Sequence, residues 1–166
     1  MHPVPSAPLR TASVDSGGRH YDIKIWAEVH EATCADHAYG LVATYLAAHP
    51  CRGLVRQLAT TTVNGKAVGF NVASLSIPGS DAQHPYDNAA QFRQLVEADG
   101  TGNVDDLLRD GWRLPSGPTS VPQPNAFETI GQDSGINIYD MWYLAGPTPH
   151  NDPPLLQMAQ DIFLQY

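Results

Sequence analysis

A proline placed directly after a helix-like segment makes residues 33–58 the most constrained part of this chain. The apolar residues of the segment recur at the three- and four-residue spacing of one buried helix stripe: Ala38, Leu41, Val42, Tyr45 and Leu46. Pro50 cannot continue a helix, and the run that follows, residues 54–63, is rich in strand-forming residues. The segment therefore predicts a helix, a stop and a strand, which the rest of the fold must cover.

Two cysteines, Cys34 and Cys51, flank this predicted helix. A continuous helix over residues 35–48 rises ~1.5 Å per residue and holds its ends about 20 Å apart. A disulfide needs Cα atoms within about 7 Å, and the three residues after the helix reach back at most ~10 Å. We therefore expect two reduced thiols, unless the helix is shorter or is broken near Gly40.

Strict alternation predicts the first strand, and two turn sequences predict hairpins. The apolar positions of the first strand are Tyr21, Ile23, Ile25, Ala27 and Val29, so we expect them to share one face of the sheet. Asn64-Gly65 joins residues 54–63 to residues 66–77, and this dipeptide is the strongest short hairpin signal. Asp133-Ser134-Gly135 joins residues 126–132 to residues 136–144 as a second hairpin.

Further helices are predicted over residues 88–98, as a short helix over residues 103–111, and from Asp152 to the end of the chain. The order of elements is β-α-β-β-α-β-β-α, apart from the short helix. Its first half matches the start of a ferredoxin-like unit. We therefore predict an α+β fold, a ferredoxin-like two-layer sandwich with an antiparallel sheet of about five strands and helices on one face.

Composition divides the chain into a flexible tail or linker, residues 1–18, and a single domain, residues 19–166. Hydrophobic residues make up 42% of the chain, enough for a core. A net charge of −8 argues against nucleic-acid binding. No apolar run approaches the ~20 residues of a membrane helix, so we expect no membrane insertion. The chain as given predicts a cytoplasmic protein, or alternatively the soluble extracytoplasmic part of an anchored one.

No motif in the sequence predicts catalysis, a metal site or a cofactor. His30 and His37 lie near Cys34, but these residues lack the ligand spacing typical of zinc sites. Residues 100–103, Gly-Thr-Gly-Asn, are better interpreted as successive helix caps than as an anion cradle. Arg52 and Arg56 are expected to form structural ion pairs with the Asp or Glu residues of the first strand, in preference to an anion site.

Aromatic residues provide the remaining candidates for a binding surface. Trp26 lies on the otherwise polar face of the first strand. The last strand carries bulky residues on both faces, with Tyr139 and Tyr143 on one face and Asp140 on the other. Such a strand is either covered on both sides or meets a partner.

These observations favour a non-catalytic domain that binds a protein partner or associates with itself through the face that carries Trp26 or Tyr139 and Tyr143. The alternative is a small-ligand-binding protein or enzyme of the dimeric ferredoxin-like type, with a pocket between sheet and helices. In that case His30, His37, Tyr139 and Asp140 are the first residues to test.

The segment Cys-Ala-Asp-His-Ala-Tyr-Gly at residues 34–40, followed by His-Pro-Cys-Arg-Gly at residues 49–53, resembles a pattern in a group of actinobacterial proteins of unknown function. In that group a similar domain often follows an N-terminal membrane anchor. The resemblance covers about the first half of the chain. It implies no activity and no catalytic residues, but it favours an exported origin.

Overall fold

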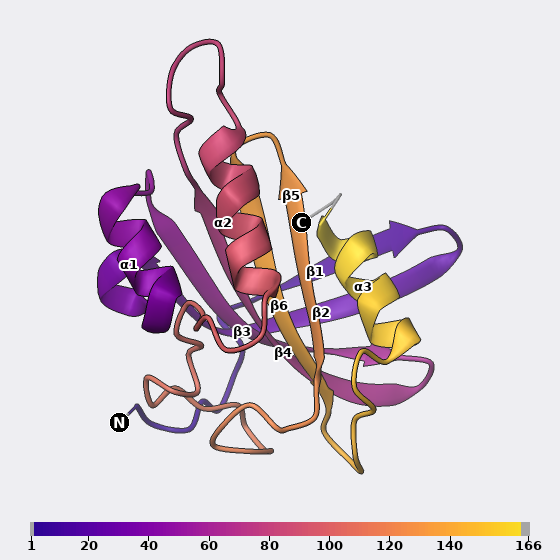
Figure 1. Ribbon diagram of the computed structural model, residues 1–166. Helices are drawn as coiled ribbons and strands as arrows, with labels where there is room; N and C mark the ends of the chain where they lie inside the picture. The colour runs from indigo at the N-terminus through magenta and orange to yellow at the C-terminus, as the bar shows by residue number, and fades with distance from the viewer. Residues whose placement is uncertain (1, 164–166) are drawn as a thin grey trace.

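The computed structural model describes residues 2–163 as a six-stranded antiparallel sheet that carries helices on both faces (Figure 1). Neighbouring strands follow the order β1-β2-β3-β4-β6-β5. The strands are β1 (Arg10–Ser16), β2 (Arg19–Glu31), β3 (Leu54–Val63), β4 (Lys66–Ser76), β5 (Ala126–Gln132) and β6 (Gly135–Tyr143). The helices are α1 (Gly40–Ala48), α2 (Asp87–Glu97) and α3 (Pro153–Phe163), with a 3₁₀ turn, η1 (Ala35–His37), before α1.

The ferredoxin-like sandwich predicted from the order of elements is wrong. That fold needs helices that cross over between parallel strands. Here all strand pairs are antiparallel, and α1 leads from β2 to its direct neighbour β3. After α2 the chain forms the edge strand β5, and β6 then returns between β4 and β5. The sheet is therefore a meander with one exchange of order, with six strands rather than about five.

Strand β1 forms within residues 10–16, which composition had placed in a flexible tail. Val14 is buried and pairs with Tyr21 of β2. Gly17 and Gly18 have φ of 56° and 80°, and these values suit a two-residue hairpin turn. Ala12 and Val14 already alternate with polar neighbours, so a strand signal was present, but the Pro- and Ser-rich surroundings outweighed it.

Helix α3 covers one face of the sheet, which we call the α3 face. Its buried residues pack on apolar side chains of the central strands to form a continuous core. The largest members of this core are Ile23, Phe70, Tyr139, Met141 and Ile162. The α3 face is thus closed by apolar contacts over most of its area.

The opposite face, which we call the pocket face, is covered by α1, α2 and the irregular segment 98–125. In Figure 1, α1 and α2 stand together and apart from α3. Helices on both faces also correct the prediction that they lie on one. Two clusters form the core here, one under α1 and α2 and one under the irregular segment. Leu107, Leu108 and Leu114 of that segment pack with Leu58 and Trp142.

A β-bulge at Trp26 moves the apolar residues of β2 from one face of the sheet to the other. Ile25 pairs with Ala59, but after the bulge Ala27 pairs with Leu58. Ile25 belongs to the core under α3, whereas Ala27 belongs to the pocket face. The alternating residues of this strand therefore do not share one face as predicted, because an extra residue inverts the pleat. The same inversion brings Glu31 to the pocket face.

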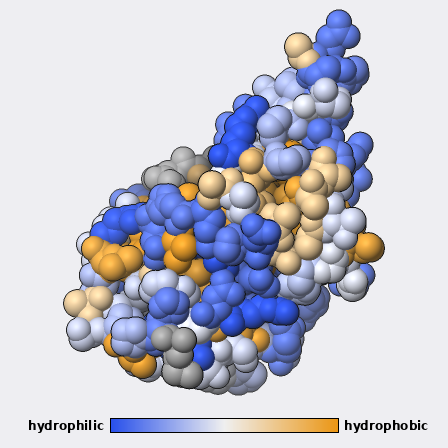
Figure 2. Space-filling model, turned by 90° about the vertical axis from the view of Figure 1, so that its left-hand side faces the viewer, coloured by the Kyte–Doolittle hydropathy of each residue, from blue (hydrophilic) through white to orange (hydrophobic). Residues whose placement is uncertain are grey.

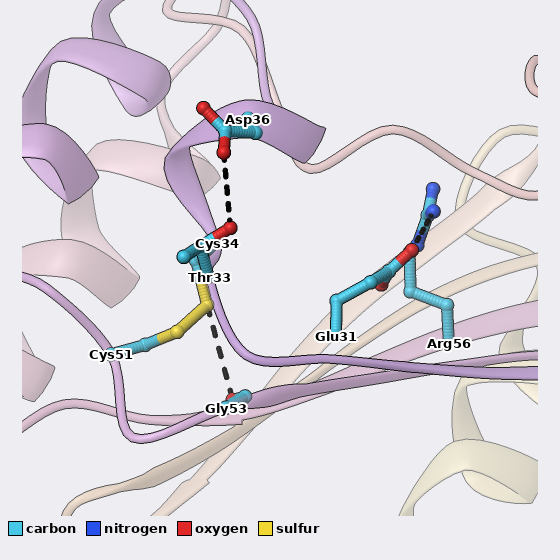
Figure 3. Close-up of a disulfide and its surroundings, with 7 residues drawn as sticks. All are labelled: Glu31, Thr33, Cys34, Asp36, Cys51, Gly53 and Arg56. Carbon is cyan, nitrogen blue, oxygen red and sulfur yellow. Dashed lines mark hydrogen bonds and ion pairs between the residues drawn. A yellow bond between two sulfur atoms is a disulfide. The ribbon is translucent and has the colours of Figure 1, made fainter.

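Helix α1 is shorter than predicted, and the two cysteines form a disulfide (Figure 3). Gly40 has φ +67° and interrupts the helix, so residues 35–37 form only the η1 turn. The chain bends back at this point, and the Cα atoms of Cys34 and Cys51 lie 6.0 Å apart. The expectation of two reduced thiols was therefore wrong, because it assumed one continuous helix over residues 35–48.

Both predicted hairpins are present. Asn64 and Gly65 have φ of 52° and 78°, and β3 pairs with β4 up to Val63 and Lys66. The pairing of β5 with β6 likewise closes across residues 133–134. The short helix predicted over residues 103–111 forms turns instead. In the described part of the chain, no helix combines the length and apolar character needed to cross a membrane.

Candidate functional site

The candidate site is a pocket of about 570 Å³ on the pocket face, a size typical of small-molecule sites. It lies where the start of α1, the end of α2 and the segment 98–125 meet above the sheet. Asp140 of β6 and Phe127 of β5 belong to its sheet side. The polar residues that line it most directly are Tyr39, Asp99, Asp106, Gln123, Asn125, His150 and Asn151.

The pocket wall is built where residues 101–105 run beside residues 37–42. Tyr39 N–H donates to the Asn103 carbonyl at 3.0 Å, and Val42 N–H donates to the Thr101 carbonyl at 3.0 Å. The second bond satisfies one of the unpaired amides in the first turn of α1. A Cβ atom on Gly102 would lie 2.1 Å from the Tyr39 carbonyl oxygen, so only glycine fits this crossing.

Arg56 of β3 holds the next part of the irregular segment onto the sheet. Its guanidinium is buried and reaches Glu31 at 2.5 Å and Asp110 at 2.6 Å, as Figure 3 shows for the Glu31 pair. A further bond of 2.8 Å runs from Arg56 to the carbonyl of Asp105. The ion pair expected for Arg56 is thus present, and it ties residues 105–110 to β2 and β3 at once. The ion pair expected for Arg52 is not found among the described residues, because its guanidinium bonds to Ser76 and Ser134 instead.

Asn71 of β4 adds a second tie from the sheet. It is buried, and its side-chain oxygen accepts the backbone N–H of Leu107 at 3.0 Å. A buried amide without a partner would cost free energy, so this bond fixes where the segment crosses the sheet. With Arg56 and Asn71 engaged, the polar groups of the central strands are used to position the wall of the pocket.

Asp140 differs from these two residues because it has no partner of this kind. It pairs in register with Asn71 on one side and Phe127 on the other. Within residues 2–163, its carboxyl group makes no hydrogen bond and no ion pair. Burial, and in second place the charge of Asp106, raises its pKa to about 7. A carboxyl group of this kind in a pocket is typical of a functional site.

Asn125 is a second polar group without a partner. Asn125 is only 6% exposed and lines the same pocket. Its backbone carbonyl accepts the N–H of Asn151, but its side-chain amide has no hydrogen-bond partner in the described part of the chain. A carboxamide offers both donors and an acceptor, so Asp140 and Asn125 together can hold a polar ligand.

A second hollow has two of its charged side chains paired within the fold. The groove of about 390 Å³ between α2 and the β5–β6 hairpin is lined by Arg93 and Glu97. These two side chains pair with each other at 3.0 Å, and both also bond to Thr129. Their polar atoms are therefore already used within the fold.

Two of the aromatic residues predicted as a binding surface, Tyr139 and Tyr143, lie on the α3 face, away from the pocket. Tyr139 is 0% exposed in the core under α3, and burial raises its pKa to about 12. Tyr143 donates its hydroxyl hydrogen to Asp152 at 2.6 Å. Because side chains alternate along β6, these tyrosines point away from Asp140.

The other predicted residues are also scattered. Trp26 lies at the bulge, and its indole N–H donates to Thr60 Oγ1 at 2.8 Å. His30 is exposed and pairs with Glu28 at 2.8 Å. His37 lies 3.6 Å from Glu31 and its carbonyl accepts Asp105 N–H at 2.7 Å, so it supports the pocket wall. Of the six predicted residues, Asp140 alone lines the pocket.

Sequence reasoning missed most of the pocket, although two signals pointed to it. Residues 114–125 contain four prolines, which predict a long irregular loop, and ordered long loops are often functional. Residues 100–103 were considered as an anion cradle and then interpreted as helix caps. Both segments line the pocket, the first through Gln123 and Asn125. The sequence did not indicate that these two segments meet above Asp140.

Residues 2–163 contain no cluster of three or more His, Cys, Asp or Glu side chains arranged to hold a metal ion. Comparison of the chain with protein-family models, with curated proteins and with solved structures finds no match. The resemblance to the actinobacterial group therefore stays a prediction from the sequence pattern.

Proposed function

We propose that this domain binds a small polar molecule in the Asp140 pocket. The observation that carries the proposal is the pair of unpartnered polar side chains, Asp140 and Asn125, in one pocket of about 570 Å³. Buried polar groups in folded proteins are usually paired. Asp140, which is partly buried, and Asn125, which is buried, have no such partner in the described part of the chain and line one pocket, where a ligand can supply it.

Nuclear magnetic resonance with a panel of small amines, amides, polyols and carboxylic acids tests this proposal. A binder is expected to shift the backbone resonances of residues 99–106, 123–127 and 139–141. Ala98→Trp places a large ring at an exposed position on the pocket rim and should abolish these shifts. Ala47→Trp, exposed on α1 away from the pocket, is the matched control.

The proposal fails if no member of the panel shifts the resonances of the pocket residues. It also fails if the shifts survive in the Ala98→Trp variant, because the ligand would then bind elsewhere. Loss of binding in both tryptophan variants would point to a general effect of the bulky substitution, and the comparison would then be repeated with Ala98→Phe.

The Cys34–Cys51 disulfide supports an extracytoplasmic place for this function. Disulfides persist in oxidising compartments and are rare in the cytosol. The bond closes the η1 turn and α1, which carry Tyr39 at the pocket rim. An exported ligand-binding domain also agrees with the anchored proteins that the sequence pattern resembles.

A protein-interaction or self-association module is the second candidate, and the exposed side of α1 favours it. Helix α1 is apolar around its whole circumference, yet Leu41 is 58% exposed and Tyr39 40%. Figure 2 views the molecule from the side that α1 occupies and shows apolar residues gathered there. Light scattering that finds a dimer, which Leu41→Glu returns to a monomer, would support this function.

A further inference from the structure

The charges around the pocket indicate which ligand it takes. Resting on the binding function proposed above, we infer that the Asp140 pocket holds a small organic cation, a primary amine or guanidinium group. Four carboxylates line it: Glu97, Asp99, Asp106 and Asp140. Among the described residues that line it there is no lysine or arginine, and His150 is the single basic side chain.

Most of this negative charge is not neutralised within the fold. Glu97 pairs with Arg93 at 3.0 Å, so its charge is offset. Asp106 accepts the backbone N–H of Arg109 at 2.8 Å, which leaves its carboxylate charged. Because burial and the charge of Asp106 both favour the neutral form of Asp140, a cation bound beside Asp140 favours its ionised form and offsets the repulsion from Asp106.

Two helix ends also border the pocket. The C-terminal turn of α2, at residues 96–98, opens on the pocket and presents the negative end of the helix dipole. The N-terminal end of α1 also lies on the rim, but its Val42 amide is already bonded to Thr101. Thr101 Oγ1 likewise donates to the Leu95 and Ala98 carbonyls at the end of α2, so the acidic side chains, rather than the helix ends, make the pocket negative.

The geometry favours an organic cation over a bare ion. No described cluster supplies the three or more ligands that a metal site needs. Asn125 offers a free amide oxygen to an N–H donor, and Tyr39 and Phe127 offer apolar ring surface to an alkyl stem. The Arg109 guanidinium lies 4.2 Å from the centroid of the Tyr39 ring and pairs with Asp105 at 3.1 Å, so its charge is offset by a carboxylate that does not line the pocket.

Three probes of equal length test the charge directly: n-pentylamine, 1-pentanol and pentanoate. Each is titrated into the full chain while the resonances of residues 99–106, 123–127 and 139–141 are followed. We expect saturable shifts with pentylamine and binding about tenfold weaker or more for the other two, since one charge-assisted contact is worth about that factor.

Asp140→Asn assigns the effect to the residue. The variant should lose about tenfold of its affinity for pentylamine and leave the affinity for pentanol unchanged. Asp133→Asn removes the same charge at an exposed turn with φ +59°, where asparagine fits, and should leave both affinities unchanged.

The outcomes separate the two proposals. If pentanol or pentanoate binds as tightly as pentylamine at the same resonances, the cation inference is overturned while the binding function stands. If pentylamine binds there equally well to the Asp140→Asn variant, the inference is also overturned. If none of these probes and no member of the wider panel shifts the pocket resonances, both proposals fail.

Discussion

Two acidic residues on opposite faces of one sheet, Asp161 buried and Asp140 partly buried, show how differently a fold can treat the same side chain. On the α3 face, Asp161 is 3% exposed and accepts bonds from Arg19 at 2.6 Å and from Tyr21 at 2.6 Å. On the pocket face, Asp140 has no such partner within residues 2–163. Their pKa values diverge accordingly. The hydrogen bonds from Arg19 hold the pKa of Asp161 well below its usual range, and burial raises that of Asp140 to about 7.

The difference separates structure from function. Asp161 joins α3 to the β1–β2 hairpin, so its charge is satisfied when the protein folds. The Asp140 carboxyl group loses hydration on folding and gains no hydrogen bond or ion pair from the described residues in return. A carboxylate without a partner is retained in a stable domain when something outside the chain uses it.

Breaking the wall of the pocket face should have the largest effect. Arg56→Leu leaves Glu31 and Asp110 facing each other without a cation, and we expect a loss of about 3–5 kcal/mol of unfolding free energy. Urea unfolding followed by circular dichroism measures it. Arg52→Leu, an exposed arginine bonded to Ser76 and Ser134, is the control and should cost less than about 0.5 kcal/mol. Similar losses for both variants would mean that Arg56 does not hold the segment.

Asp140→Asn should act in the opposite direction and depend on pH. The folded protein keeps the Asp140 proton up to a pKa of about 7, whereas the unfolded chain releases it near the ordinary aspartate pKa of 3.8. The folded state therefore binds more protons between these values, and its stability falls as pH rises. The variant avoids this loss and should gain on the order of 3 kcal/mol over the wild type at pH 8 and almost nothing at pH 4.

The groups that face Asp140 bear on this pH profile. Asp106 raises the Asp140 pKa further, and Tyr39 and His150 line the same pocket. Asp106→Asn should therefore shift the midpoint of the stability profile to lower pH. Stability curves for wild type and Asp140→Asn that run parallel from pH 4 to pH 8 would contradict the assignment.

The smallest effect is expected on the α3 face, where Asp161 keeps several partners. Tyr21→Phe removes one buried hydrogen bond to a charged group and should cost about 2 kcal/mol at pH 7. Tyr143→Phe removes a similar bond to Asp152 in a more exposed setting and should cost less. Equal losses in thermal or urea unfolding would show that the burial of Asp161 adds nothing to the bond.

Local signals predicted the two hairpins joined at residues 64–65 and 133–135 and the positions of α2 and α3, because turn residues and periodicity act over a few positions. Asn64-Gly65 required positive φ at both residues, and the structure has it. The predictions failed where a single residue changed which distant parts of the chain lie next to each other. The bulge at Trp26 inverted half of β2, and the break at Gly40 brought Cys34 within bonding distance of Cys51.

The pocket shows the same limit. Asp140 was named from the sequence because β6 carries bulk on both faces. Asn125 and Asp106 were out of reach, since they approach Asp140 only through the ties made by Arg56 and Asn71. Sequence periodicity indicates which residues of a strand lie on the same face of the sheet. It does not indicate which distant loop packs on that face.

The crossing of residues 39–40 and 101–102 has a consequence for the ancestry of this domain. Chains that share the fold are free to exchange Asp99 or Gln123 as their ligands change, since these side chains are exposed at the rim. They are not free to exchange Gly102, because any Cβ there meets the Tyr39 carbonyl. The paired glycines, Gly40 and Gly102, are therefore the mark by which remote relatives can be recognised after the chemistry of their pockets has diverged.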